Sequence, residues 1–140
     1  MKLIVGDHTN SNGQAIAHWY INNQKLPVCP PYSAMLWAND SGPVCAAIFN
    51  CFNGSSIEVH FYGPKGLTRQ VLHDIAMYVY LQLRCNILIA KIPRANTFKK
   101  YLSRIGFKYC AIIPSYFGPH RSGDAIMYYA KKDNILKWIK

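Results

Sequence analysis

The sequence predicts an α+β protein built on a mixed, mostly antiparallel sheet of about six strands, with helices on both faces and a strand–loop–helix–strand crossover at its centre. Three observations lead to this prediction. Apolar and polar residues alternate over residues 56–62, which is the period of a strand. Apolar residues then recur at three- and four-residue spacing over residues 68–84, the period of a helix, and a continuous apolar run follows at residues 87–90. Because one helix joins the two strands, we expect them to lie parallel at the centre of the sheet.

The elements before the crossover are predicted from turns and short patterns. Residues 7–14 are polar and indicate a turn, and residues 15–23 are compatible with a short helix. Three prolines between residues 27 and 31 exclude regular structure there. Residues 33–38 and 44–52 then indicate a hairpin, which leads through the turn at Asn53 and Gly54 into the alternating strand.

The elements after the crossover helix are predicted in the same way. The run at residues 87–90 has no polar face, so we expect a central strand buried on both sides. A helix follows over residues 96–105, and Gly106 ends it as a left-handed cap. Two more strands, over residues 108–114 and 124–131, and an amphipathic tail over residues 134–140 complete the chain.

Length and composition limit the classes of protein. The chain has 140 residues, of which 51% are hydrophobic and 14% aromatic, so intrinsic disorder is excluded and a single domain over residues 1–140 is expected. No apolar run reaches the ~18 residues that a membrane-spanning helix needs, and the apolar start is too short for a signal peptide. We therefore expect a cytoplasmic protein without a membrane partner.

The charge is distributed unevenly along the chain. The net charge is +10, yet the first 66 residues are neutral, and the excess lies in residues 67–140. It is densest between residues 91 and 108, where six basic residues occur without an acid: Lys91, Arg94, Lys99, Lys100, Arg104 and Lys108. Such a segment favours an anionic partner, which could be nucleic acid, a phosphorylated cofactor or an acidic protein surface, although a solvated face would also explain it.

Cysteine and histidine do not form a recognisable metal site. The five cysteines and five histidines are widely spaced, and no cysteine pair has the spacing of a zinc site. We expect no metal, and we interpret the cysteines as buried, reduced thiols.

The loop before the long helix is a candidate anion site. It contains Gly63 and Gly66, which allow close backbone approach, and it leads to Thr68, which can cap the helix. Unpaired N–H groups at a helix N-terminus attract phosphate, and Lys65 and Arg69 add positive charge. No nucleotide-hydrolase or dinucleotide motif is present, so the loop alone indicates a phosphate or pyrophosphate without naming the ligand.

From about residue 32 to about residue 132, the chain resembles the GNAT superfamily of N-acyltransferases. Three segments carry the resemblance: the strand–loop–helix stretch at residues 58–83, residues 90–107 with Asn96 and the Gly106-Phe107 pair, and residues 124–129. Residues 59–68 look especially like small acyltransferase-like proteins of tailed bacteriophages. A group of virion proteins from some short-tailed phages has a similar helix between the asparagine and the glycine.

The resemblance implies acetyl-CoA as co-substrate and an unidentified amine as acceptor. In that family the strand and the loop that follows it bind the pantetheine arm and the pyrophosphate, and the asparagine contacts the arm. The residues at matching positions are Phe61, Tyr62, Gly63, Lys65, Gly66, Leu67, Thr68, Arg69 and Asn96, with Lys99 as a further phosphate contact.

Direct acyl transfer also needs a base that takes a proton from the amine. Glu58 and His60 lie on the polar face of the alternating strand, beside the expected thioester, so Glu58 is the predicted base and His60 its partner or substitute. Tyr101 is the candidate acid for the departing thiolate, with Tyr128 and Tyr129 as weaker ones.

A second hypothesis is a non-catalytic protein of the same fold: a virion component, or a module that binds a host protein or nucleic acid. The loop lacks the family's usual glutamine or arginine before its glycines, and Leu102 stands where the family often has a tyrosine. A virion protein would be found in the phage particle rather than free in the host cytoplasm.

Overall fold

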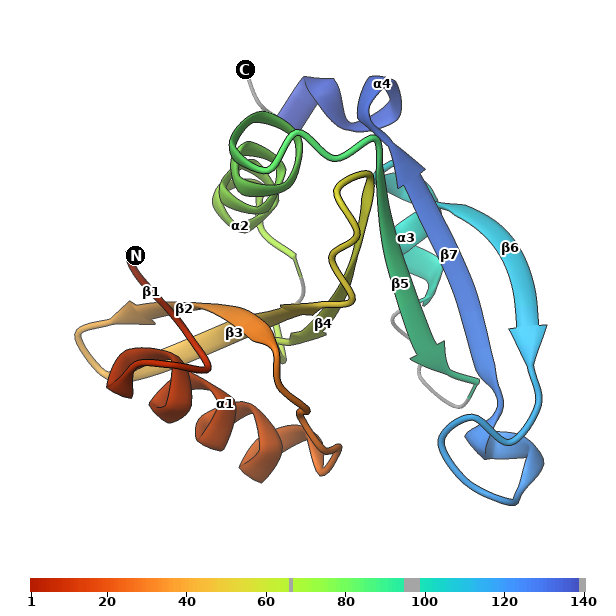
Figure 1. Cartoon of the computed structure of the whole chain (residues 1–140), viewed down its shortest axis with the longest axis horizontal. Helices are drawn as coiled ribbons and strands as arrows, with labels where there is room; N and C mark the ends of the chain where they lie inside the picture. Colours follow the sequence, from red (N-terminus) through yellow and green to blue (C-terminus); the bar gives the residue numbers. More distant parts are fainter. Residues whose placement is uncertain (66, 95–98, 139–140) are drawn as a thin grey trace.

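The computed structural model describes residues 1–65, 67–94 and 99–138 (Figure 1). Seven strands form one sheet in the order β1-β2-β3-β4-β5-β7-β6, and every neighbouring pair is antiparallel except β4 and β5. The predicted fold class and the parallel central pair are therefore confirmed. The strands are β1 (Lys2–Asp7), β2 (Tyr32–Asn39), β3 (Gly42–Asn50), β4 (Ser56–Tyr62), β5 (Ile87–Pro93), β6 (Lys108–Ile113) and β7 (Ala125–Lys131).

Helices cover both faces of the sheet. Helix α1 packs on one face of β1 to β4, around Ile16, Tyr20 and Ile48. Helix α2 and the π-helix η1 pack on the other face, around Trp37, Val71 and Val79. The helical segments are α1 (Ser11–Gln24), α2 (Arg69–Ala76), η1 (Met77–Gln82), α3 (Lys99–Arg104), η2 (Arg121–Gly123), α4 (Lys132–Ile135) and η3 (Leu136–Trp138).

The N-terminal region is more regular than the sequence predicts. Residues 2–7 form the edge strand β1, which the prediction missed because the segment is short and has no clear alternation of burial. Helix α1 starts at Ser11, inside the predicted turn, because the Asn10 side chain accepts a hydrogen bond from the Gly13 N–H at 2.8 Å and so caps the helix.

Two later predictions also need correction. The crossover helix changes to π-helical hydrogen bonding after Ala76, so the segment predicted as one helix has two parts. Strand β5 is buried on one face only: Leu88, Ala90 and Ile92 are buried, whereas the residues that alternate with them are half-buried. Helix α1 does not extend over that second face in the described part of the chain (Figure 1), which explains the difference from a central strand covered on both sides.

The cysteines are free, but they are not all buried. Cys45 and Cys85 are buried, whereas Cys29, Cys51 and Cys110 are exposed. No group of three or more potential metal ligands occurs in the described part of the chain. Within the same residues, no helix is long and apolar enough to cross a membrane.

Candidate active site

The sheet opens at its centre because the parallel pair separates partway along. Residues 56–59 of β4 pair with residues 87–90 of β5, and the pairing stops after Val59 and Ala90. Strand β4 continues through His60 to Tyr62, still paired with β3 but not with β5. Beyond Val59, the edge of β4 therefore faces the opening instead of β5.

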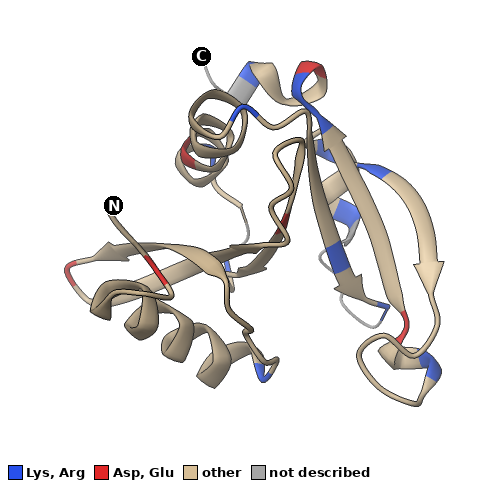
Figure 2. Cartoon of the chain, viewed as in Figure 1, with Lys and Arg blue, Asp and Glu red and all other residues tan. Residues whose placement is uncertain are grey.

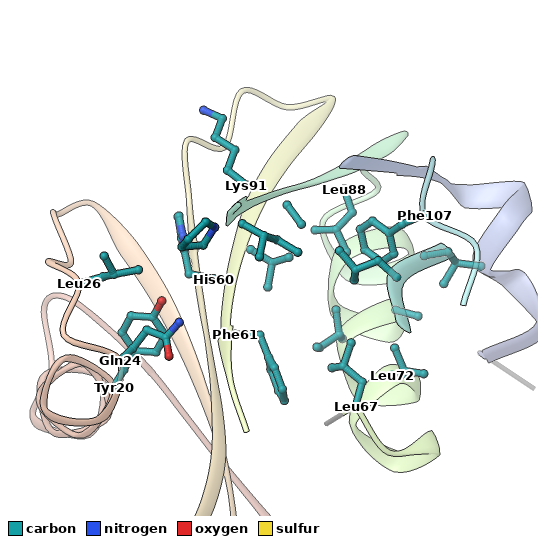
Figure 3. Close-up of a pocket in the computed structure, with 18 of the residues that line it drawn as sticks. Tyr20, Gln24, Leu26, His60, Phe61, Leu67, Leu72, Leu88, Lys91 and Phe107 are labelled. Carbon is teal, nitrogen blue, oxygen red and sulfur yellow. The ribbon is translucent and has the colours of Figure 1, made fainter. Parts of the chain in front are cut away.

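A cavity occupies this opening and reaches both faces of the sheet (Figure 3). On the α1 side it is lined by Tyr20, Gln24, Leu26, His60 and Lys91. On the α2 side it is lined mainly by apolar side chains, among them Phe61, Leu67, Leu72, Leu88, Leu102 and Phe107. The cavity has a volume of about 70 Å³, so its narrow part has room for a small group only.

The loop between β4 and α2 lies at one mouth of the opening. Gly63 is in close contact with its surroundings, because a Cβ atom there would lie 2.7 Å from Phe61 Cζ and 2.9 Å from Cys45 Cβ. Thr68 caps α2, since its hydroxyl accepts a hydrogen bond from the Val71 N–H at 3.3 Å. Lys65 and Arg69 are exposed beside this helix N-terminus. The arrangement can bind an anion through N–H groups and two cations.

Glu58 is buried beside the opening and is ion-paired. Its Oε1 atom lies 2.5 Å from Lys91 Nζ, and both side chains are largely shielded from water. Burial raises the pKa of Glu58, but hydrogen bonds from Cys51 and Lys91 and the charge of Lys91 outweigh it, and the pKa is lowered overall. Burial in turn lowers the pKa of Lys91, but the Glu58 carboxylate outweighs it, and the pKa is raised. Glu58 is therefore a carboxylate, and a weak base, at neutral pH.

His60, unlike Glu58, carries no charge at neutral pH and is in none of the ion pairs among the described residues. Burial lowers its pKa, and the nearby Glu58 carboxylate only partly offsets this effect, so the imidazole is neutral. Its Nε2 atom lies 3.1 Å from Asn50 Oδ1. Because the amide oxygen can only accept, Nε2 carries the proton, and Nδ1 has the free lone pair.

The sequence reasoning missed the partners of these two residues. In the sequence, Lys91 is one of the six bases between residues 91 and 108. In strand β5 it lies on the same face as Ile89, and Ile89 pairs with Glu58, so Lys91 is on the face that bears the predicted base. The sequence places Asn50 and Cys51 in the predicted strand over residues 44–52, and it predicts a buried thiol at Cys51 but no contact with Glu58. Tyr116, in the loop between β6 and β7, was not singled out, yet its ring centroid is 5.0 Å from Lys91 Nζ. The alternation along β5 could have revealed Lys91, but the loop contact depends on the tertiary structure.

The structure brings most of the predicted residues together, but not all of them. Glu58, His60, Phe61, Tyr62, Gly63, Lys65, Leu67, Thr68 and Arg69 surround the opening or the loop. Tyr101 is 54% exposed, with Arg104 over its ring, whereas its neighbour Leu102 is buried and lines the cavity. Gly66 and Asn96 lie outside the described residues, as does the side chain of Lys99.

The six-base segment is divided between the two sides of the sheet (Figure 2). Lys91 and Lys108 lie on the same face as Glu58, because Glu58 pairs with Ile89, Ile89 with Tyr129, and Tyr129 with Lys108. Helix α3, which carries Lys100 and Arg104, packs through Leu102 into the core on the other face. The segment therefore does not form one continuous basic surface.

Solved structures with this architecture are N-acetyltransferases. A variant of spermidine N-acetyltransferase SpeG from Vibrio cholerae is similar over 100% of both chains, with a TM-score of 0.74 and 13% identity. The ribosomal-protein-S18-alanine N-acetyltransferase from Escherichia coli matches with a TM-score of 0.65 and 15% identity, covering 93% of this chain and 94% of its own. The N-acetyltransferase PseH from Campylobacter jejuni, solved in complex with acetyl coenzyme A, matches with a TM-score of 0.62 and 16% identity, covering 93% and 99%.

These similarities define the class of fold. The protein has the fold of GNAT N-acetyltransferases, as the resemblance in sequence implied. No protein-family model matches the chain, and no curated protein matches it either.

Proposed function

We propose that the protein transfers an acyl group, in the first instance acetyl, from acyl-coenzyme A to an amine. The observation that carries this proposal is the cavity that crosses the sheet where β4 and β5 separate. Because residues from both faces of the sheet line the cavity, the thioester would approach it from one side and the amine from the other, so that they meet at the centre. The small volume favours a short acyl group.

The coenzyme would lie along β4 beyond Val59, where this strand no longer pairs with β5, with its phosphates at the loop before α2. Phe61 and Tyr62 would flank the pantetheine arm there, and Leu67 offers apolar contact. Lys65, Arg69 and the capped helix N-terminus suit the pyrophosphate. Gly66, Asn96 and Lys99 belong to this proposal through the sequence resemblance alone.

The proposed base is His60, not Glu58. Nδ1 of the neutral imidazole takes a proton from the amine as its nitrogen attacks the thioester carbonyl, and the C–S bond then breaks. The sulfur leaves as a thiolate and is protonated by the imidazolium or by water. Glu58, fixed by Lys91, stabilises the imidazolium by its negative charge. Tyr101, which points into solvent, has no part in this scheme.

Calorimetry and kinetics of His60→Gln test the proposal. The wild type should bind acetyl-CoA and release free coenzyme when an amine is added. His60→Gln should lower kcat by about 100-fold or more while coenzyme affinity stays unchanged. His18→Gln, an exposed histidine on α1, is the matched control and should behave as wild type. Absence of acetyl-CoA binding at millimolar concentration would exclude the proposal.

The pH profile gives a second readout. Because the pKa of His60 lies below its ordinary value of 6.5, the acid limb of kcat that this residue controls should lie below pH 6.5. The limb should disappear in His60→Gln. A limb that remained in the variant would assign the base to another group.

A second candidate is a protein of this fold that binds the coenzyme or another partner without turnover. It is favoured by the buried Leu102, which lines the cavity where the family often has a tyrosine. Binding of acetyl-CoA without acyl transfer to any amine of a broad panel would support this candidate, including the predicted virion role.

A further inference from the structure

In the described part of the chain, no helix covers one face of the sheet over β5, β7 and β6, although the loop between β6 and β7 brings Tyr116 to Lys91 there; we call this the uncovered face. In β5 and β7, buried residues alternate with half-buried ones, whereas β2 and β3 each contain a run of consecutive buried residues. Helix α1 covers β1 to β4 on this face and does not extend over the other half (Figure 1). The uncovered face presents Ile87, Ile89, Met127 and Tyr129.

This face is continuous with the α1 side of the cavity. Glu58, Ile89, Tyr129 and Lys108 form a row across four strands, and Lys91, which also lines the cavity, lies one step further along β5. A chain that lies on the uncovered face can therefore reach His60.

The free charge on the face is positive. The two acids nearby are neutralised: Glu58 by Lys91, and Asp124 by Arg94 at 3.8 Å. Lys108 and Lys131 are exposed and take part in none of the ion pairs found among the described residues. They lie on the same face and are diagonal neighbours across β6 and β7, about 7–8 Å apart at Cβ.

We infer that the amine acceptor is an acidic peptide segment that docks on the uncovered face of β5, β7 and β6, with its acidic side chains on Lys108 and Lys131. This inference rests on the proposed acyl transfer. An apolar strip flanked by free lysines complements a peptide with both apolar and acidic side chains. A second copy of the chain is a poor occupant, because each copy has a net charge of +10. Of the four side chains that the uncovered face presents, only Tyr129 has a ring on which a base could stack, so nucleic acid fits less well.

The positions of His60 and the two lysines also predict how far the acidic side chains of the peptide lie from the amine that is acetylated. Lys108, on β6, is three strands away from His60, which is about 15 Å at the usual distance between strands. Lys131, on β7, is only two strands away, but it is level with Ser56, four residues before His60, so its distance from His60 is similar. An extended peptide rises about 3.3 Å per residue, so the acidic side chains should follow the amine by about four to six residues. Alternate residues of the peptide are then about 7 Å apart, which matches the two lysines.

The test compares three acceptors with the full chain and acetyl-CoA. The acidic probe is a ten-residue peptide with a free N-terminal amine, glutamates at the fifth and seventh positions and neutral residues elsewhere. The basic probe has lysines at the same two positions, with their side-chain amines methylated so that they keep their charge but cannot be acetylated. The third acceptor is spermidine. We expect kcat/KM for the acidic peptide to exceed the others by about tenfold or more.

Charge reversal tests the docking residues. The double variant Lys108→Glu/Lys131→Glu should lose about tenfold in kcat/KM for the acidic peptide, because KM rises while kcat is nearly unchanged. Its kcat/KM for the basic peptide should increase. Lys2→Glu, on the opposite edge strand of the sheet, is the control and should change neither. An unchanged double variant, or equal use of spermidine, would overturn the inference.

Binding measurements distinguish a failure of the peptide-docking inference from a failure of the proposed acyl transfer. Anisotropy of a labelled acidic peptide reports docking without the coenzyme. If the protein binds acetyl-CoA but prefers spermidine, the acidic-peptide acceptor is excluded and acyl transfer remains supported. If the peptide docks but acetyl-CoA does not bind, the proposed acyl transfer is excluded. Tighter and steeply salt-dependent binding of a single-stranded oligonucleotide would assign the face to nucleic acid instead.

Discussion

Glu58 and Lys91 each carry a charge that the surrounding protein shields from water. The carboxylate is ion-paired with the Lys91 ammonium and also accepts a hydrogen bond from Cys51. Removing one partner would leave the other charge shielded from water and unpaired. The resulting loss of folding stability is larger than the net stability that the intact pair provides. The ion pair therefore holds the two strands together at the point where they begin to separate.

Replacing Glu58 should destabilise the fold through Lys91. Glu58→Gln should lower the free energy of unfolding by about 1–3 kcal/mol at pH 7, measured by urea denaturation. Glu58→Gln/Lys91→Met should recover most of the loss, because no unpaired charge remains. Asp40→Asn, an exposed acid in the turn between β2 and β3, is the control and should change stability by less than about 0.5 kcal/mol.

The effect should depend on pH in a defined window. The pKa of Glu58 is lowered, so its contribution is present above the ordinary value of 4.5 and is lost as the pH falls through the folded value. The pKa of Lys91 is raised, so its contribution is complete below 10.5 and is lost only above that pH. A difference between wild type and Glu58→Gln that persisted at pH 2 would contradict the ion pair.

The sequence predicts which strand face bears the site, but not the state of its groups. Glu58 and His60 follow from simple alternation along one strand. Their roles depend on Asn50, Cys51 and Lys91, which come from β3, the residue after it and β5, and whose positions depend on strand register. Alternation in one strand cannot show that Lys91 neutralises the predicted base.

At the level of elements, the close packing of β1 against α1 depends on glycine. A Cβ atom on Gly13 would lie 1.9 Å from the Asp7 carbonyl oxygen, which is backbone and cannot easily move. Gly6 faces the same contact, because its Cβ would lie 2.3 Å from the Gly13 nitrogen. The turn that leads from β1 into α1 therefore has no room for a side chain at either position.

A methyl group at this contact should separate the two elements. Gly13→Ala should lower the free energy of unfolding by about 2–4 kcal/mol, or prevent folding, because the backbone of β1 must shift. Gly118→Ala, in a loop where a Cβ meets nothing within 4 Å, is the matched control and should keep the wild-type urea midpoint. Equal midpoints for the two variants would show that β1 does not pack on α1 in this way.

Strong periodicity allowed the central elements to be predicted, and weak periodicity explains the errors. The helix after β4 was recognised because Val71, Ile75 and Val79 form one buried stripe, which η1 continues. Strand β1 was missed because an edge strand with few buried residues has little pattern. The half-open face of β5 was missed because residues 87–90 are apolar on both faces, although only one is covered.

For the molecule as a whole, the opening between β4 and β5 divides the sheet into two halves joined by four residue pairs. A coenzyme bound along β4 beyond Val59 would contact both halves and stabilise the folded state by mass action. Ligand at about 100 times its Kd should add about 2.7 kcal/mol to the free energy of unfolding, seen as a rise in Tm with acetyl-CoA concentration.

Hydrogen exchange should locate this stabilisation. Strand β4 does not pair with β5 at residues 60–62, so acetyl-CoA bound along this segment should slow the exchange of its amides by about tenfold or more. Amides of residues 56–59 that donate hydrogen bonds to β5 are already protected. Their exchange should slow only by the factor that corresponds to the rise in global stability. Pantetheine, which lacks the pyrophosphate, should protect the same amides but require a higher concentration, because it does not use the N-terminus of α2. Protection confined to the loop before α2, without protection of β4, would mean that the phosphates bind while the arm lies outside the sheet, and acyl transfer at His60 would then be excluded.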